Sequence, residues 1–125
     1  HAPHATTEKV STFSEAANGI SVLETALGSL MPLVHEGKLP LPVLIERLTA
    51  APANFLGVGL GSLKTGGPAD VTIFDPNAEW VVDSTKFVSK GKNTPLDGAK
   101  LKGRVVATIV GGGVRYDARE SGGAG

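Results

Sequence analysis

The chain has 125 residues, of which 41% are hydrophobic, and its 12 basic residues balance its 12 acidic residues. This composition is typical of an ordinary globular chain with one modest core, and the zero net charge argues against nucleic acid or a membrane surface as a partner. Apolar runs stay well short of the roughly 18 to 20 residues that cross a bilayer. The sequence has no cysteine, which excludes disulfides and Cys-ligated zinc and fits a cytoplasmic setting. Because the chain begins at His1 without a signal-peptide pattern, we expect further chain upstream.

The first predicted element is a helix over residues 21–34. Apolar residues recur there at spacings of three and four, which indicates one buried face. Ser21 and Glu24 fit a capping box at the start of this helix, and Gly37 is expected to end it. We expect His35 to cap the helix C-terminus, where a donor or a cation is favoured.

A second helix is predicted over residues 42–50. Pro42 suits the first turn of a helix because its missing N–H has no intrahelical acceptor there. Pro52 is expected to stop this helix. Residues 52–56 are then expected to form one further helical turn that ends at Gly57.

Beyond Gly57 the sequence becomes rich in glycine and proline, and its apolar residues fall into short β-branched runs. These runs predict strands over residues 69–74, 79–82, 103–110 and 114–116. The last two are expected to form a hairpin across residues 111–113, since glycine adopts the positive φ that a tight reversal needs. The predicted organisation is an incomplete α+β piece with helical residues 1–57, β-rich residues 58–116 and a flexible tail over 117–125. Neither half looks self-sufficient, so the helices are expected to pack on strands that the chain lacks.

Few residues are candidates for catalysis or for binding a ligand. His1 and His4 lie on either side of Ala2 and Pro3, and two histidines near a chain end do not make a site by themselves. The glycine-rich residues 57–61 and 111–113 lack the pattern of a phosphate loop and are expected to form turns. Turn or solvent-exposed roles are also expected for three aspartates near the predicted strands, Asp70, Asp75 and Asp83. From these residues alone the chain has no complete active site.

Several segments nevertheless form a recognisable series when they are taken together and in order. They are residues 1–4, 19–20, 23–27, 52–53, 61–63, 69–76, 89–95 and 101–105. This series resembles the C-terminal part of dihydroorotases of the amidohydrolase superfamily, over nearly the whole chain. The strand at 69–75 is shared by many amidohydrolases, including hydantoinases and allantoinases. The His-Ala-Pro-His and Lys-Asn-Thr-Pro segments, at 1–4 and 92–95, are the more specific signals.

The resemblance implies a parent enzyme with an α/β fold, the (β/α)₈ or TIM barrel, to which this chain adds the last barrel loop, the closing helices and a β-rich domain. It implies a zinc-dependent hydrolase that interconverts N-carbamoyl-L-aspartate and L-dihydroorotate in pyrimidine biosynthesis. In the family the catalytic aspartate and the zinc ligands precede the segment that matches residues 1–4. We therefore expect neither a catalytic residue nor a metal ligand in this chain, and no activity from it alone.

Four residues take substrate-binding roles by resemblance. His4 matches a histidine that holds the substrate carboxylate, a role that suits an imidazole donor. Ala17, Asn18 and Gly19 match a loop that closes over the substrate through main-chain groups, although the more usual sequence there is Pro-Phe-Gly.

The expected partners are a small-molecule substrate, the remainder of the barrel, and either a second copy or aspartate transcarbamoylase. One alternative is a non-catalytic dihydroorotase-like subunit that acts as a scaffold for aspartate transcarbamoylase, which the residues upstream would distinguish. Another is a stand-alone binding module, whose exposed helical stripes would need a partner.

Overall fold

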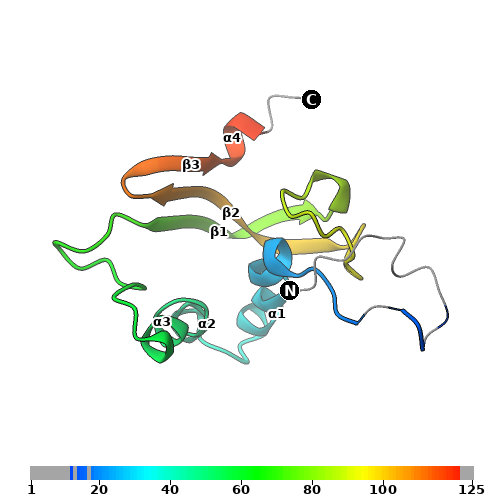
Figure 1. Ribbon diagram of the computed structural model, residues 1–125, viewed down its shortest axis with the longest axis horizontal. Coiled ribbons are helices and arrows are strands. Elements are labelled where there is room, and N and C mark those ends of the chain that lie inside the picture. The colour runs from blue at the N-terminus through cyan, green and yellow to red at the C-terminus, as the bar shows by residue number, and fades with distance from the viewer. Residues whose placement is uncertain (1–11, 13, 17, 122–125) are drawn as a thin grey trace.

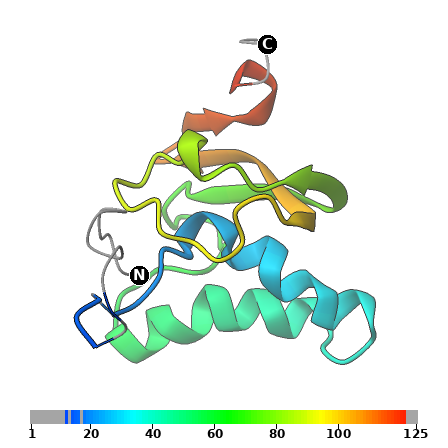
Figure 2. The same ribbon diagram turned by 90° about the vertical axis from the view of Figure 1, so that its right-hand side faces the viewer.

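The computed structural model describes residues 12, 14–16 and 18–121. Its elements in chain order are η2 (Leu23–Thr25), α1 (Ala26–His35), α2 (Leu41–Leu48), α3 (Ala50–Leu56), β1 (Val71–Val81), η3 (Ser84–Lys86), β2 (Lys100–Val110), β3 (Gly113–Asp117) and α4 (Ala118–Ser121), where η marks a 3-10 helix. The sheet lies above the first three helices, with α1 next to it and α2 and α3 farther away (Figures 1 and 2). None of the helices in the described part of the chain is long and apolar enough to traverse a lipid bilayer.

The predicted helix over 21–34 is confirmed as a 3-10 turn, η2, that leads into α1. The predicted capping box is wrong. Val22 and Thr25, which precede η2 and α1, make no side-chain cap bond. The Glu24 carboxylate instead accepts hydrogen bonds from the segment between β1 and β2. Residue types that suit a cap therefore serve a tertiary contact.

The C-terminal end of α1 is closed by its main chain. Gly37 adopts a left-handed conformation with φ 72°, and its N–H bonds to the Val34 carbonyl at 3.0 Å, so the predicted helix end is confirmed. The predicted capping role of His35 is wrong, because its Nε2 lies 2.9 Å from the Pro76 carbonyl oxygen in β1. His35 thus joins the end of α1 to the sheet.

Helices α2 and α3 follow almost without a gap. The chain breaks at Thr49, whose φ of −131° and ψ of −83° are not helical and whose Oγ1 donates to the Ile45 carbonyl at 2.7 Å. The prediction that Pro52 stops a helix is wrong, since it is the third residue of α3, where an N–H would have no intrahelical acceptor. The predicted end at Gly57 is confirmed, and the helical turn predicted over residues 52–56 is part of the longer α3.

The three strands form one antiparallel sheet in the order β1-β2-β3. Two strands were predicted where the structure has the single β1, because the pairing with β2 resumes after an irregularity between Asp75 and Glu79. The Asp75 carboxylate accepts from the N–H groups of the next two non-proline residues at 2.8 and 3.2 Å. The predicted hairpin is confirmed, and its turn has positive φ at Gly111 and Gly112.

Of the three aspartates expected in turn or solvent-exposed roles, Asp75 and Asp83 lie in local turns, whereas Asp70 is exposed and bonds to the distant hairpin turn. Asp70 accepts from the Gly111 N–H at 2.8 Å, Asp75 from the irregularity in β1, and Asp83 from the Thr85 N–H at 3.1 Å. Residues 118–121, predicted as part of a tail, form the short α4, and residues 122–125 lie outside the described part of the chain.

Helix α1 packs on β2. Met31 is completely buried, and a Cβ atom on Gly28 would lie 3.1 Å from the Gly103 carbonyl oxygen. The expectation that the helices pack on strands absent from the chain is therefore wrong for α1. By contrast, Phe55 and Leu56 at the end of α3 are largely exposed, at 90% and 71%.

Candidate functional site

The structure describes two of the four residues that are expected to bind substrate. His4 and Ala17 lie outside the described residues. Asn18 and Gly19 are described and exposed, and they lead into η2. Gly19 has φ 93°, in the region that only glycine adopts at little cost. The structure therefore places the second half of the predicted loop in an exposed, irregular segment before α1.

Asn93, which lies 74 residues further along the chain, holds this segment. Its Nδ2 donates to the Gly19 carbonyl at 3.0 Å, and its own carbonyl oxygen accepts from the Ser21 N–H at 2.7 Å. Ser21 is only 2% exposed, so the second bond lies in a dry setting where an unpaired N–H is costly. One residue thus fixes two main-chain positions beside Asn18.

Glu24 makes a second anchor five residues after Gly19. Its Oε1 accepts from the Ser89 N–H at 2.9 Å and its Oε2 from the Val88 N–H at 3.2 Å. A carboxylate that accepts two main-chain donors forms charge-assisted bonds, which are stronger than bonds between neutral groups. Both anchors therefore join the segment before α1 to residues 82–99, which we call the β1–β2 connection.

The β1–β2 connection is itself ordered by local hydrogen bonds. The Lys92 ammonium donates to the Phe87 carbonyl, and the Ser84 N–H donates to Asp97 Oδ1 at 2.8 Å. Asp83 caps η3, and its hydrogen bond from the Thr85 hydroxyl holds the pKa of this carboxyl below its usual value. The connection is thus a folded structure on which other segments can be fixed.

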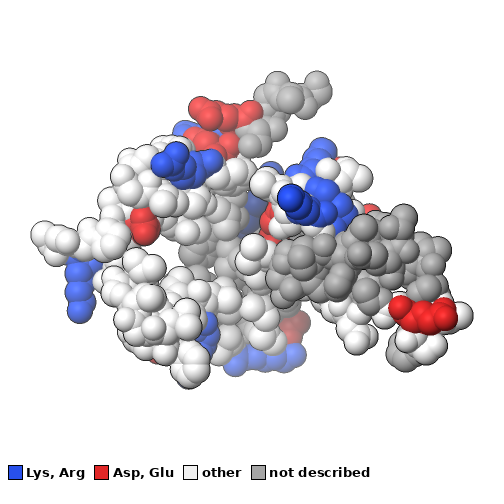
Figure 3. Space-filling model, viewed as in Figure 1, with Lys and Arg blue, Asp and Glu red and all other residues white. Residues whose placement is uncertain are grey.

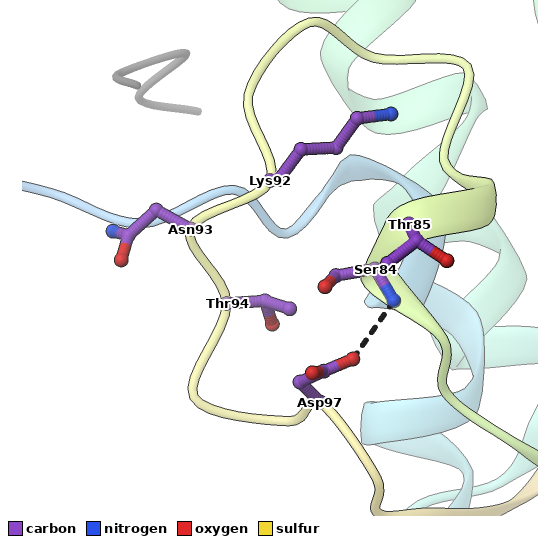
Figure 4. A pocket seen from close by; sticks show the side chains of 6 residues that line it. All are labelled: Ser84, Thr85, Lys92, Asn93, Thr94 and Asp97. Atoms are coloured by element: carbon purple, nitrogen blue, oxygen red, sulfur yellow. Dashed lines mark hydrogen bonds between the residues drawn. The ribbon is translucent and has the colours of Figure 1, made fainter. Parts of the chain in front are cut away.

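A polar pocket of about 390 Å³ lies within the β1–β2 connection. It is lined by Ser84, Thr85, Lys92, Asn93, Thr94 and Asp97 (Figure 4). The Asn93 side chain points away from Ser84 and Thr85, in keeping with its bond to Gly19 (Figure 4). Basic side chains gather over the connection, whose sequence carries Lys86, Lys90 and Lys92 (Figure 3).

The described residues do not fit a metal centre. Among them, no group of three or more His, Cys, Asp or Glu side chains is placed to hold a metal ion. The third histidine, His35, is the last residue of α1, and its side chain bonds to the Pro76 carbonyl in β1. What the described residues can do is present and brace a loop.

Asn93 and Glu24 were missed as site residues by the sequence. The segment 92–95 was recognised as specific to a family, but nothing in it indicates which atoms Asn93 contacts. Glu24 was assigned to a helix cap because its spacing from Ser21 fits one. A signal was available only for Asn93, through its place in a family-specific segment.

Comparisons with known proteins identify the family of the chain. The profile of the amidohydrolase family matches residues 6–115. A dihydroorotase from Geobacter metallireducens is 50% identical over 116 residues, which are 93% of this chain and 27% of that protein, and one from Aquifex aeolicus is 49% identical with the same coverage. Among solved structures, the L-hydantoinase (dihydropyrimidinase) from Arthrobacter aurescens superposes with a TM-score of 0.77 at 34% identity, over 83% of this chain and 24% of its own. The chain spans about a quarter of the length of these relatives. It therefore belongs to the amidohydrolase family, and its sequence is similar to that of dihydroorotases over a part of their length.

Proposed function

We propose that this chain is the C-terminal, loop-bearing part of a dihydroorotase, a hydrolase that opens and closes a cyclic amide. The substrate pair would be L-dihydroorotate and N-carbamoyl-L-aspartate, and the setting pyrimidine biosynthesis in the cytoplasm. The observation that carries the proposal is the 50% identity with a dihydroorotase over 93% of the chain. The L-hydantoinase is less similar, at 34% identity, which favours dihydroorotate over hydantoins as the substrate.

In this proposal the chain supplies substrate-binding groups. The His4 imidazole would donate a hydrogen bond to a substrate carboxylate, and the main chain of residues 17–19 would close over the bound molecule. Asn18 is exposed, so its main-chain groups are accessible to a ligand, and the Gly19 carbonyl next to it is held by Asn93.

Zinc, as the cofactor of the whole enzyme, would be held outside the described residues, which do not fit a metal centre. The proposal therefore gives these residues no step at a metal. It follows that the chain alone should be inactive, and that the rest of a barrel would complete the site.

The direct test is an assay of the full-length protein with L-dihydroorotate, N-carbamoyl-L-aspartate and, for comparison, hydantoin. We expect turnover of the first two at a kcat/KM well above that for hydantoin. A preference for hydantoin would overturn the assignment. A folded protein that turns over none of them but forms a complex with aspartate transcarbamoylase would instead support a non-catalytic scaffold.

The role of His4 is tested by His4→Ala in the same protein. Loss of one charge-assisted hydrogen bond costs about 1.5 to 3 kcal/mol, so kcat/KM should fall by roughly ten- to more than a hundredfold while metal content stays constant. His35→Ala is the matched control, because this histidine contacts β1 and not the loop. A change within about twofold for folded His4→Ala would exclude the substrate-binding role.

A further inference from the structure

We propose that Asn93 is a positioning residue for Asn18 and Gly19, the described part of the proposed substrate loop, so that the β1–β2 connection sets the geometry of substrate binding. The inference rests on the proposed function, because it concerns how that loop is held. It adds a residue that would act through the loop without touching the substrate.

Asn93 makes a pair of hydrogen bonds to the segment that leads into η2. Its side-chain Nδ2 bonds to the Gly19 carbonyl and its main-chain oxygen to the Ser21 N–H, at 3.0 and 2.7 Å. The two bonded positions lie on either side of Ile20, so the peptide groups leading into and out of this residue are both fixed. Gly19 is held in its left-handed conformation, with φ 93°, directly next to Asn18.

The order of the contacts along the chain shows how the two segments align. Asn93 meets Gly19 and Ser21, whereas the residues that meet Glu24 come earlier in the connection, at Val88 and Ser89. As the chain runs from 19 to 24, its partners run from 93 back to 88, so the two segments align antiparallel and are joined near both ends. Two separated anchors fix orientation as well as distance.

The β1–β2 connection, which carries Asn93, is itself held by hydrogen bonds. The Lys92 ammonium, next to Asn93, bonds to the Phe87 carbonyl and closes residues 87–92 into a small loop. At the other end of the connection the Gly98 N–H donates to the Val82 carbonyl at 2.8 Å, which ties the connection to the end of β1. Asn93 is therefore supported from the sheet.

The test uses three variants of the full-length protein. Asn93→Asp keeps the size of the side chain and the main-chain acceptor, but it places a carboxylate oxygen instead of an N–H against the Gly19 carbonyl. Loss of the donor should lower kcat/KM for L-dihydroorotate by about three- to tenfold, mainly through KM. Asn93→His, whose ring Nδ1–H can take the place of the amide donor, should recover part of that loss. Lys90→Ala is the matched control, because this exposed residue of the same connection makes no hydrogen bond or ion pair within the described part of the chain.

Amide hydrogen exchange supplies a readout that does not depend on activity. In Asn93→Asp, exchange should speed up in residues 18–22 and stay unchanged in the β2–β3 hairpin, with Tm close to that of the parent. An active parent with a change in kcat/KM below about twofold, or a loss of activity that follows Tm without faster exchange at 18–22, would overturn the inference. An inactive parent protein would overturn the proposed function, and this inference with it, before any variant is compared.

Discussion

Gly103 of β2 and Met31 of α1 pack so closely that a Cβ atom on Gly103 would lie 2.6 Å from Met31 Cγ. Gly103 also has φ 111°, a conformation that residues with a side chain rarely adopt. Met31 is completely buried at this point. The absence of a side chain at position 103 therefore sets how near the helix approaches the sheet, and with it the place of the segment that precedes α1.

Gly103→Ala should destabilise the protein through both effects. Backbone strain and overpacking together should lower the free energy of unfolding by about 2–4 kcal/mol. The matched control is Gly98→Ala, at a φ of 78° with nothing within 4 Å of the added Cβ, where only strain of about 1–2 kcal/mol applies. Urea unfolding measures both. Equal losses in the two variants would show that the contact with Met31 costs nothing.

Trp80 provides a second measure of the same region. Its Nε1–H donates to the Gly103 carbonyl at 2.8 Å in a part-buried setting. Trp80→Phe removes the donor and should lower the free energy of unfolding by about 1 kcal/mol. Circular dichroism in urea measures the change, since Trp80 is the single tryptophan and the variant loses the fluorescence signal. Unchanged stability would mean that the bond is replaced by water without cost.

Asp117 should contribute to the loss of folding stability at low pH. The hydrogen bond from the Arg119 guanidinium lowers the pKa of this carboxyl from its usual 3.8 to about 2. Because the folded-state pKa is depressed, the stabilisation is fully present above pH 3.8 and is lost as the pH falls toward 2. An NMR titration of the Asp117 carboxyl carbon tests this. Arg119→Gln should return the pKa toward 3.8, and an unchanged titration would contradict the assigned cause.

The sequence predicted the elements whose causes are local. The spacing of apolar residues gave α1, the left-handed glycines at 37 and 57 marked helix ends, and the glycines at 111 and 112 marked the hairpin. Each of these signals acts within a few residues, so no knowledge of the fold was needed. The family was also accessible, because it depends on the order of residue types.

The errors came from residues whose partners are far away in the sequence. Glu24 and His35 have the chemistry of helix caps, but they bond to Ser89 and Pro76, about 65 and 41 positions away. The anchoring role of Asn93 has the same origin, since its partner Gly19 is 74 residues away. The spacing of residues within one helix or strand carries no information about such long-range contacts. The substrate loop was therefore predicted by resemblance, whereas the residues that hold it needed the structure.

Asp97 allows a test of how firmly the β1–β2 connection is built. Its Oδ1 accepts from the Ser84 N–H at 2.8 Å, and Ser84 is only 8% exposed. Asp97→Ala would leave a buried donor without this acceptor, so the free energy of unfolding should fall by about 1–3 kcal/mol. Asp97→Asn keeps an amide oxygen at the same distance from the main chain and should lose less than half as much. Urea unfolding gives the two values, and hydrogen exchange at Ser84 reports the local effect. If both variants lost the same amount, the charge of Asp97 rather than its bond to Ser84 would be the source of its stabilisation, because charge is the property that both substitutions remove.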